Sequence, residues 1–318
     1  MMERTDRHFR YLLRLISRHA YLYTEMVPAQ ALLHGDRDRW LRFDPAEHPV
    51  ALQLGGDDPA ALARCARWAE EAGYDEVNLN VGCPSERVQA GRFGACLMLE
   101  PARVSECVAA MAAAVTVPVT VKTRTGVDHH DGYEVLRDFV AQVAAAGCRI
   151  FIVHARKAWL KGLSPKENRQ VPPLDYDRVV RLKRDFPHLE IIVNGGLNDL
   201  GQARRLTEVL DGVMIGRAAY DDPYLLSEAD RLFYGDERPV PGREEVVRGM
   251  FPHLARELNA GVRLNAMTRH LLNLYRGRPG GRAWRRFLSD NAHRPDAGLA
   301  VLEQALEHMS AHSLGRVA

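Results

Sequence analysis

The sequence predicts an α/β fold, a (β/α)₈ barrel followed by a small helical domain, and three observations support it. Short apolar stretches typical of buried strands recur with helix-like segments between them, the rhythm of parallel βαβ units. Most of these stretches end in a polar residue, as at the catalytic face of such a barrel. Beyond the last stretch the rhythm stops. The predicted strands are Tyr21–Met26, Val50–Leu54, Glu76–Asn80, Pro118–Lys122, Ile150–His154, Ile191–Asn194 and Gly212–Gly216.

The number of predicted strands is seven, one fewer than a closed barrel needs. A helix-like run, Asp6 to Ser17, precedes the first of them. An open parallel barrel would leave two edges, and each buried backbone group without a partner costs about 1–3 kcal/mol. We therefore expect the chain as printed to lack the first barrel strand.

The C-terminal part is predicted to be a bundle of three or four short helices. Two prolines, two glycines and mixed charge mark a linker at Gly235–Arg243. After it, apolar residues recur at helical spacing in Val246–Leu258, Leu264–Leu274, Ala283–Leu288 and Leu299–Met309. We place the barrel domain at residues 1–234 and the helical domain at 235–318.

Composition excludes several classes of protein. With 318 residues and 46% hydrophobic content, the chain can bury one large core and a modest second domain. The net charge of +2 is too small to imply nucleic acid by itself. Five cysteines without a CxxC pair, and an N-terminus without an apolar signal core, favour a reduced cytosol. No apolar run approaches the roughly 20 residues that span a bilayer.

Glycine turns after the last two strands predict a phosphate site. Barrels of this kind commonly bind phosphate there, because glycines let backbone N–H groups approach its oxygens. The turns contain Asn194, Gly195 and Gly196, and then Gly216 and Arg217. The alternative is that the glycines only form tight turns. Neither GxGxxG nor a Walker loop occurs, which disfavours a Rossmann dinucleotide site or a P-loop.

The polar strand ends suit flavin mononucleotide (FMN). Lys122 and His154 supply a cation and an imidazole for the ring and the ribityl-phosphate ends, and a lysine near the ring would stabilise its reduced, negative form. Gln53 and Asn80 can hydrogen-bond ring amide edges or the base of a substrate. Each of the four could instead merely satisfy a strand end.

Cys83 is the candidate catalytic residue. It lies just past a strand end in a loop flanked by glycine and proline, so we expect it exposed at the mouth. A free thiol is mostly protonated at neutral pH and can act as a general acid. Cys96 lies in an apolar run and is expected in the core. The other cysteines fall on helix-like segments and are interpreted as structural: Cys65, Cys107 and Cys148.

A basic segment indicates a local surface for RNA. No acidic residue occurs from Gly261 to Ser289, where arginines accumulate with aromatic residues between them. Phosphate neutralisation would give affinity, and shape would select the RNA. The alternative is an ordinary solvated helix face. The arginines are Arg263, Arg269, Arg276, Arg278, Arg282, Arg285 and Arg286, and the aromatic residues are Tyr275, Trp284 and Phe287.

Taken together, these runs resemble the tRNA-dihydrouridine synthases, and more closely their bacterial A subfamily, which acts on D-loop uridines 20 and 20a. The resemblance extends from Met1 to about Leu288. The loop Gly82-Cys83-Pro84-Ser85 is its most specific part. The other matching runs are Thr5–His8, Leu22–Met26, Asn78–Asn80, Gly94–Met98, Val121–Arg124, Val153–Trp159 and Asp211–Arg217.

The resemblance implies a flavin barrel with a tRNA-binding helical domain, and a role for each matching residue. NADPH would reduce FMN, hydride would reach C6 of a flipped-out uracil, and Cys83 would protonate C5. It also implies a further strand before the first helix, so we expect a gene start placed too far downstream. FMN contacts would be Met1, Met2, Gln53, Lys122, His154, Asn194, Gly195, Gly196, Gly216 and Arg217. Contacts to tRNA would be Asn80, Lys166, Arg169, Arg282 and Arg285.

We further expect a cytoplasmic monomer with no metal and no membrane contact. Two rival interpretations remain. One is an FMN-dependent oxidoreductase of a small pyrimidine-like metabolite, which would not need the arginine-rich domain. The other is a tRNA-binding protein that has lost flavin chemistry, motivated by the missing strand. Flavin absorbance tests the second, and RNA binding tests the first.

Overall fold

The computed structural model describes residues 1–314, with side chains for residues 1–310. It has two compact units, the first formed by residues 1–3 and 21–216 and the second by residues 4–20 and those from 217 onward. The helix near the N-terminus and residues 217–234 thus group with the C-terminal helices. A domain boundary at 234/235 stays a prediction.

The first unit is a curled sheet of seven parallel strands in sequential order, β1 to β7, so the α/β barrel class and the seven predicted strands are confirmed. Among the described residues, β1 and β7 are its two edges. The strands are β1 (Leu22–Pro28), β2 (Val50–Gly55), β3 (Glu76–Val81), β4 (Val119–Arg124), β5 (Ile150–His154), β6 (Glu190–Asn194) and β7 (Gly212–Met214).

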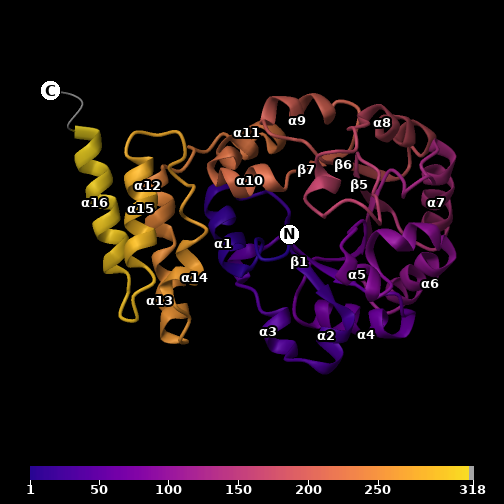
Figure 1. The fold of residues 1–318 in the computed structure, drawn as a ribbon, viewed down its shortest axis with the longest axis horizontal. Coiled ribbons are helices and arrows are strands. Elements are labelled where there is room, and N and C mark those ends of the chain that lie inside the picture. The colour runs from indigo at the N-terminus through magenta and orange to yellow at the C-terminus, as the bar shows by residue number, and fades with distance from the viewer. Residues whose placement is uncertain (315–318) are drawn as a thin grey trace. The chain divides into compact units, whose positions relative to one another are not determined.

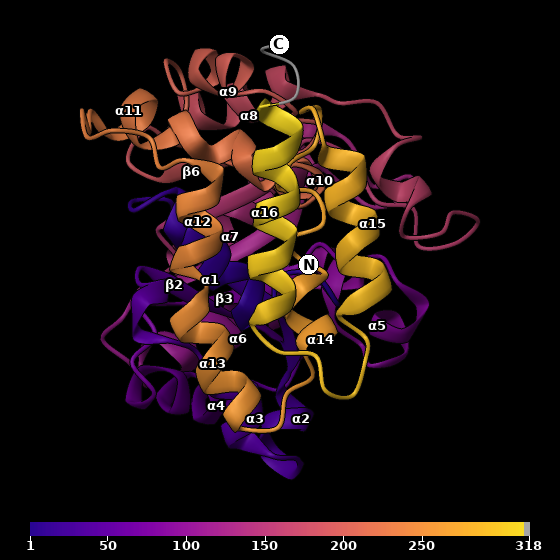
Figure 2. The same ribbon diagram turned by 90° about the vertical axis from the view of Figure 1, so that its left-hand side faces the viewer.

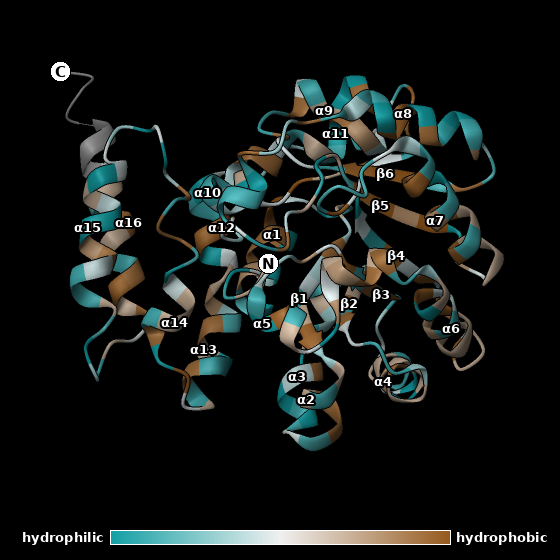
Figure 3. Cartoon of the chain, turned by 45° about the vertical axis from the view of Figure 1, so that its right-hand side comes forward, coloured by the Kyte–Doolittle hydropathy of each residue, from teal (hydrophilic) through white to brown (hydrophobic). Residues whose placement is uncertain are grey.

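Helices cover the outside of this sheet (Figure 1). Several strands are mainly apolar because parallel strands are buried on both faces, and Figure 3 shows β5 and β6 as mainly hydrophobic. The helices and 3₁₀ turns of this unit are α2 (Ala29–His34), α3 (Arg37–Leu41), η1 (Pro45–Glu47), α4 (Pro59–Glu71), α5 (Glu86–Ala90), η2 (Gly94–Leu99), α6 (Pro101–Ala112), α7 (Tyr133–Ala145), η3 (Glu167–Arg169), α8 (Tyr176–Asp185) and α9 (Leu200–Leu206).

The second unit is helical (Figure 2). Pro252 lies in the first turn of α13, where its missing N–H is tolerated, so the predicted helix 246–258 is two helices. Residues 235–242 of the predicted linker form an irregular segment, and residue 243 begins α12. Helices α15 and α16 lie side by side. The elements are α1 (Arg7–Ile16), α10 (Arg217–Asp221), η4 (Pro223–Glu228), α11 (Ala229–Tyr234), α12 (Arg243–Gly249), α13 (Phe251–Asn259), α14 (Leu264–Thr268), α15 (Gly281–Asn291) and α16 (Ala300–Leu314).

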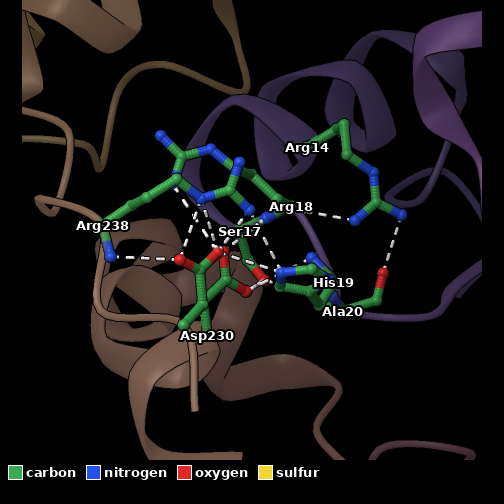
Figure 4. A network of polar contacts seen from close by, with 8 residues as sticks. Arg14, Ser17, Arg18, His19, Ala20, Asp230 and Arg238 are labelled. Carbon is green, nitrogen blue, oxygen red and sulfur yellow. Dashed lines mark hydrogen bonds and ion pairs between the residues drawn. The ribbon is translucent and has the colours of Figure 1, made fainter. Parts of the chain in front are cut away.

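Two polar clusters fix α1 within the second unit. At its start, Asp6 caps the helix and pairs with Arg269 and His270 at 2.6 and 3.0 Å. At its end, Asp230 accepts hydrogen bonds from the Ser17 hydroxyl and from two backbone N–H groups (Figure 4). Both ends of α1 are therefore tied to segments more than 200 residues away in the sequence.

Buried histidines make this unit sensitive to acid. The Nδ1 atom of His8 lies 2.8 Å from Nε2 of His253, and both residues are buried. Burial, with smaller contributions from Arg7 and His253, lowers the pKa of His8 to about 3, while Asp6 and Glu257 oppose the shift. Because the unfolded chain takes up this proton near pH 6.5 and the folded chain does not, the free energy of unfolding falls as pH drops from about 6.5 toward 3.

We predict that His8→Gln reduces this acid sensitivity. The difference in melting temperature between wild type and variant should shrink as pH falls from about 7 to about 4, because only the wild type loses stability through this imidazole. Thermal melts across that range measure it. The exposed His34→Gln serves as the control, and a constant difference between wild type and His8→Gln would contradict the prediction.

Candidate functional site

The polar strand ends converge at one edge of the sheet, as predicted. Neighbouring strands pair in register there, with Asn80 beside Lys122 and His154 beside Asn194. The side chains also meet. The amide nitrogen of Asn80 donates to Gln53 Oε1 at 2.8 Å, and Lys122 Nζ donates to Asn194 Oδ1 at 3.2 Å.

The loop after β3 presents Cys83 at this edge. Its backbone N–H donates to Asn80 Oδ1 at 3.0 Å, and its carbonyl accepts from Ala95 N at 2.8 Å. Gly94 makes this second contact possible, since it has a φ of +80° and a Cβ there would lie 2.5 Å from the Cys83 carbonyl oxygen. The backbone is held on both sides while the partly exposed thiol lies 3.6 Å from the Ser85 hydroxyl.

A buried cation, Arg124, lies beneath this loop. Its guanidinium donates to the carbonyl oxygens of Gly82 and Asn168, each at 3.0 Å. Gln89 adds a second connection, because its amide donates to the carbonyls of Pro84 at 2.9 Å and Leu160 at 2.8 Å. The Cys83 loop is therefore joined at two places to the long loop that follows β5.

Burial controls the charges near the site. It lowers the pKa of Lys122 to about 8, an effect increased by the neighbouring Arg124. It also lowers the pKa of Arg124 to about 10. At the opposite end of β3, burial raises the pKa of Glu76 to about 7, against the hydrogen bonds from Thr120 and Tyr23.

The first of the two predicted phosphate turns has a backbone that requires glycine. Gly195 and Gly196 have φ values of +110° and +67°, which L side chains rarely adopt. A Cβ at Gly195 would lie 2.5 Å from Cδ2 of His154. The Tyr176 hydroxyl donates to the Gly195 carbonyl at 2.6 Å and helps to hold the turn.

The remaining expected FMN residues lie at different places. A Cβ at Gly216 would lie 3.5 Å from the Met1 sulfur, so the chain start and the end of the last strand are close. Met2 is 51% exposed. Arg217 is the first residue of α10, in the second unit.

Of the expected tRNA contacts, Lys166 precedes η3 and Arg169 is its last residue, in the loop after β5, with Lys166 exposed and Arg169 half-buried. Arg282 and Arg285 are exposed on α15. All seven arginines of the basic segment are exposed; we call them the arginine surface. Within the described residues, no ion pair joins Arg282 or Arg285 to a carboxylate, whereas Arg269 pairs with Asp6.

Two of the three interleaved aromatic residues belong instead to the interior of the second unit, whereas Phe287 on α15 is half-buried. Trp284 is 1% exposed and its indole N–H donates to the Leu271 carbonyl at 2.9 Å. Tyr275 packs against it with ring centroids 4.7 Å apart. These two rings hold the arginine-bearing segments in place, and they are not a stacking surface for bases.

The other cysteines differ partly from expectation. All five are free thiols. Cys65 on α4 and Cys107 on α6 are buried as expected, and Cys148 is buried in the turn between α7 and β5 and not on a helix. The expectation for Cys96 is wrong, because it is only half-buried, and its thiol donates to the Phe93 carbonyl at 3.2 Å.

One group of side chains has metal-like spacing, namely His19, Asp230 and Asp236 in the second unit. Hydrogen bonds and ion pairs already engage these groups. Asp230 binds the end of α1, and Asp236 pairs with Arg238 at 2.5 Å and with His19 at 3.0 Å (Figure 4). The arrangement is a structural tie, and the absence of a metal stays a prediction.

Comparison with known protein families matches residues 1–310 to the family described as dihydrouridine synthase. The chain belongs to this dihydrouridine synthase family. It is 58% identical over 316 residues to a tRNA-dihydrouridine(20/20a) synthase of Vibrio cholerae, an alignment that covers 99% of this chain and 96% of that protein. The synthase of the same name from Escherichia coli K12 is 56% identical over 308 residues, with 96% and 89% of the two chains covered.

Solved structures of other enzymes share the fold of this dihydrouridine synthase. Morphinone reductase aligns with a TM-score of 0.50 and 14% identity, over 77% of this chain and 85% of that one. A 2-naphthoyl-CoA reductase aligns with a TM-score of 0.54 and 12% identity, over 70% and 46%. At these identities the likeness concerns the fold alone. Among the described residues of the synthase, no helix is both long and apolar enough to cross a membrane.

Apart from Asn80 and Lys122, sequence reasoning missed the polar residues inside the sheet of this dihydrouridine synthase. Glu76, Asn78 and Asn80 alternate along β3, and Thr120 and Arg124 share one face of β4 with Lys122. Successive side chains in a strand point to opposite faces, so this period of two was a signal.

We predict that Gly195→Ala destabilises the synthase more than Gly162→Ala. Both glycines have positive φ, which costs an alanine about 1–2 kcal/mol. A Cβ at Gly162 meets nothing within 4 Å, while one at Gly195 meets the His154 ring. Urea unfolding measures the two losses. Equal losses would show that the His154 contact carries no cost.

Proposed function

We propose that Cys83 is the proton donor, and the strand ends the flavin site, of an enzyme that reduces uridine to 5,6-dihydrouridine in tRNA. Membership of the dihydrouridine synthase family gives the reaction class. The names of relatives at 55–58% identity favour D-loop positions 20 and 20a. The observation that carries the assignment is the Cys83 backbone, held on both sides so that its thiol stays at the mouth.

The residues present fit FMN. Gly195 and Gly196 carry no side chains of their own, so their backbone N–H groups can approach a phosphate closely, and the His154 ring lies against Gly195. Lys122 lies among the polar strand ends. Its pKa of about 8 means that the protonated form predominates at pH 7. FMN, reduced by NADPH, is the source of hydride for C6 of the uracil.

The chain's own part in the reaction is to position the base and supply a proton. The Cys83 thiol gives its proton to C5, which leaves a thiolate that takes a proton from water. Arg124, buried at the end of β4, lies beside this group, since its guanidinium donates to the Gly82 carbonyl at 3.0 Å. Asn80 holds the loop and contacts the base, which must be swung out of the folded tRNA at a cost of a few kcal/mol.

Binding elsewhere on the tRNA offsets that cost. We assign this role to Arg282 and Arg285, with Lys166 and Arg169 as further contacts. Arg282 and Arg285 are exposed, and the buried Trp284 fixes the helix that carries them. Such a surface neutralises phosphates and selects RNA mainly by shape. We further propose that the enzyme is a monomer and that it acts in the cytoplasm. Its tRNA substrate occurs in that compartment, and its five free thiols stay reduced there.

We predict that Cys83→Ala lowers dihydrouridine formation by about a hundred-fold or more, the usual contribution of a general acid. FMN content and tRNA affinity should stay at wild-type values. Mass spectrometry of modified tRNA measures the product. Cys96→Ala is the matched control, since Cys96 is also a half-buried free thiol. Equal losses in both variants would remove the reason to choose Cys83.

We also predict that the double variant Arg282→Ala/Arg285→Ala weakens tRNA binding. Removal of each arginine that neutralises a phosphate should reduce the slope of log affinity against log salt by about one. Flavin reduction by NADPH should persist. Arg204→Ala/Arg205→Ala on α9 is the control, because those arginines are also exposed but belong to the first unit. An unchanged salt slope in the first variant would exclude α15 as an RNA-binding helix.

A further inference from the structure

A continuous row of side-chain hydrogen bonds runs from the Cys83 loop to the far end of β3. It begins at the backbone N–H of Cys83 and ends at the carboxylate of Glu76, the first residue of that strand. The bonds are Cys83 N to Asn80 Oδ1 (3.0 Å), Asn80 Nδ2 to Gln53 Oε1 (2.8 Å), Gln53 Nε2 to Asn78 Oδ1 (2.8 Å), Asn78 Nδ2 to Thr120 Oγ1 (2.7 Å) and Thr120 Oγ1 to Glu76 Oε1 (2.5 Å).

The direction of every bond in this row is determined by its two ends. Backbone N–H groups can only donate, so Asn80 must turn its oxygen toward Gly82 and Cys83 and its nitrogen toward Gln53. At the other end, the ionised carboxylate of Glu76 can only accept, so Thr120 donates its proton to Oε1 and accepts from Asn78. Both ends require the same orientation of the three amides between them.

If the hydrogen bond at either end of the row were lost, the orientation of the three amides would no longer be fixed from both sides. Asn78 and Thr120 are fully buried, so an amide nitrogen without an acceptor there costs about 1–3 kcal/mol. Rotation of the Asn78 amide would relieve the cost, but its nitrogen would then face the nitrogen of Gln53. Gln53 would have to rotate in turn, and the conflict would reach Asn80 and its bonds to the Cys83 loop.

We propose that Glu76, Thr120 and Asn78 are positioning residues for the reaction: they orient the amide of Asn80 and, through it, the backbone that carries Cys83. None of the three lies at the strand ends where the cofactor and base are expected. The inference rests on the proposed function, since it concerns how the proposed acid is placed. A displacement of about 1 Å at a reacting group can cost about a hundred-fold in rate.

A variant of Tyr23 can distinguish this positioning role from a purely stabilising one. Its hydroxyl donates to the same Glu76 oxygen at 2.9 Å, but it lies outside the row that leads to Asn80. Removing it therefore takes one donor from the carboxylate and leaves the row complete. Thr120→Val takes one donor from the same carboxylate and breaks the row.

The experiment compares Thr120→Val, Thr120→Ser and Tyr23→Phe in the full-length, FMN-loaded enzyme. Thr120→Val and Tyr23→Phe should lower the melting temperature by similar amounts. Only Thr120→Val should lower kcat, by about ten-fold or more, at a KM for tRNA within about two-fold of wild type. Thr120→Ser should restore kcat, because serine supplies the same hydroxyl. If the valine variant does not fold, Thr120→Ala replaces it under the same criteria.

A second readout does not depend on catalysis. Iodoacetamide alkylation of Cys83, followed by mass spectrometry without tRNA, should be faster by about three-fold in Thr120→Val, because the loop is held less firmly, and unchanged in Tyr23→Phe. A wild-type kcat and a wild-type alkylation rate in Thr120→Val would overturn the proposal, as would equal effects in Tyr23→Phe. A wild-type enzyme that forms no dihydrouridine would refute the proposed function instead, while the alkylation rates would still test the positioning role.

Discussion

The parallel alignment of the strands is the constraint on which the rest of the first unit depends. Because each strand runs in the same direction and pairs in order with the next, all carboxyl ends meet at one edge. Residues as distant in sequence as Gln53 and Asn194 thereby belong to one site. The same alignment brings the amino-terminal ends together on the other side, where Glu76 is buried.

Much of this architecture could be predicted from the sequence, because short apolar runs that recur with helix-like segments have few other solutions. All seven strands lie within a few residues of their predicted positions. The helical region was harder to predict, since apolar spacing across Pro252 continues through a break that the proline imposes. The grouping of α1 with the C-terminal helices has no local signal, because it depends on contacts such as Asp6 with His270.

The site itself was predicted in part. Polar residues at strand ends are visible in the sequence, and Cys83 is marked by its glycine and proline neighbours. The buried partners that place them were not predicted, because a hydrogen bond such as that from Asn78 to Thr120 depends on the register between two strands. For the aromatic residues of the basic segment, a predicted surface role did not hold. Sequence spacing alone could not distinguish an exposed ring from the buried Trp284.

The two hydrogen bonds that Gln89 donates have a consequence for loop motion. One amide group holds the carbonyls of Pro84 and Leu160, and Arg124 joins the same two loops from below. A displacement of either loop must then be followed by the other, or both ties must break together. The Cys83 loop and the basic residues of the loop after β5 would therefore shift together, so that a contact made by one loop also displaces the other.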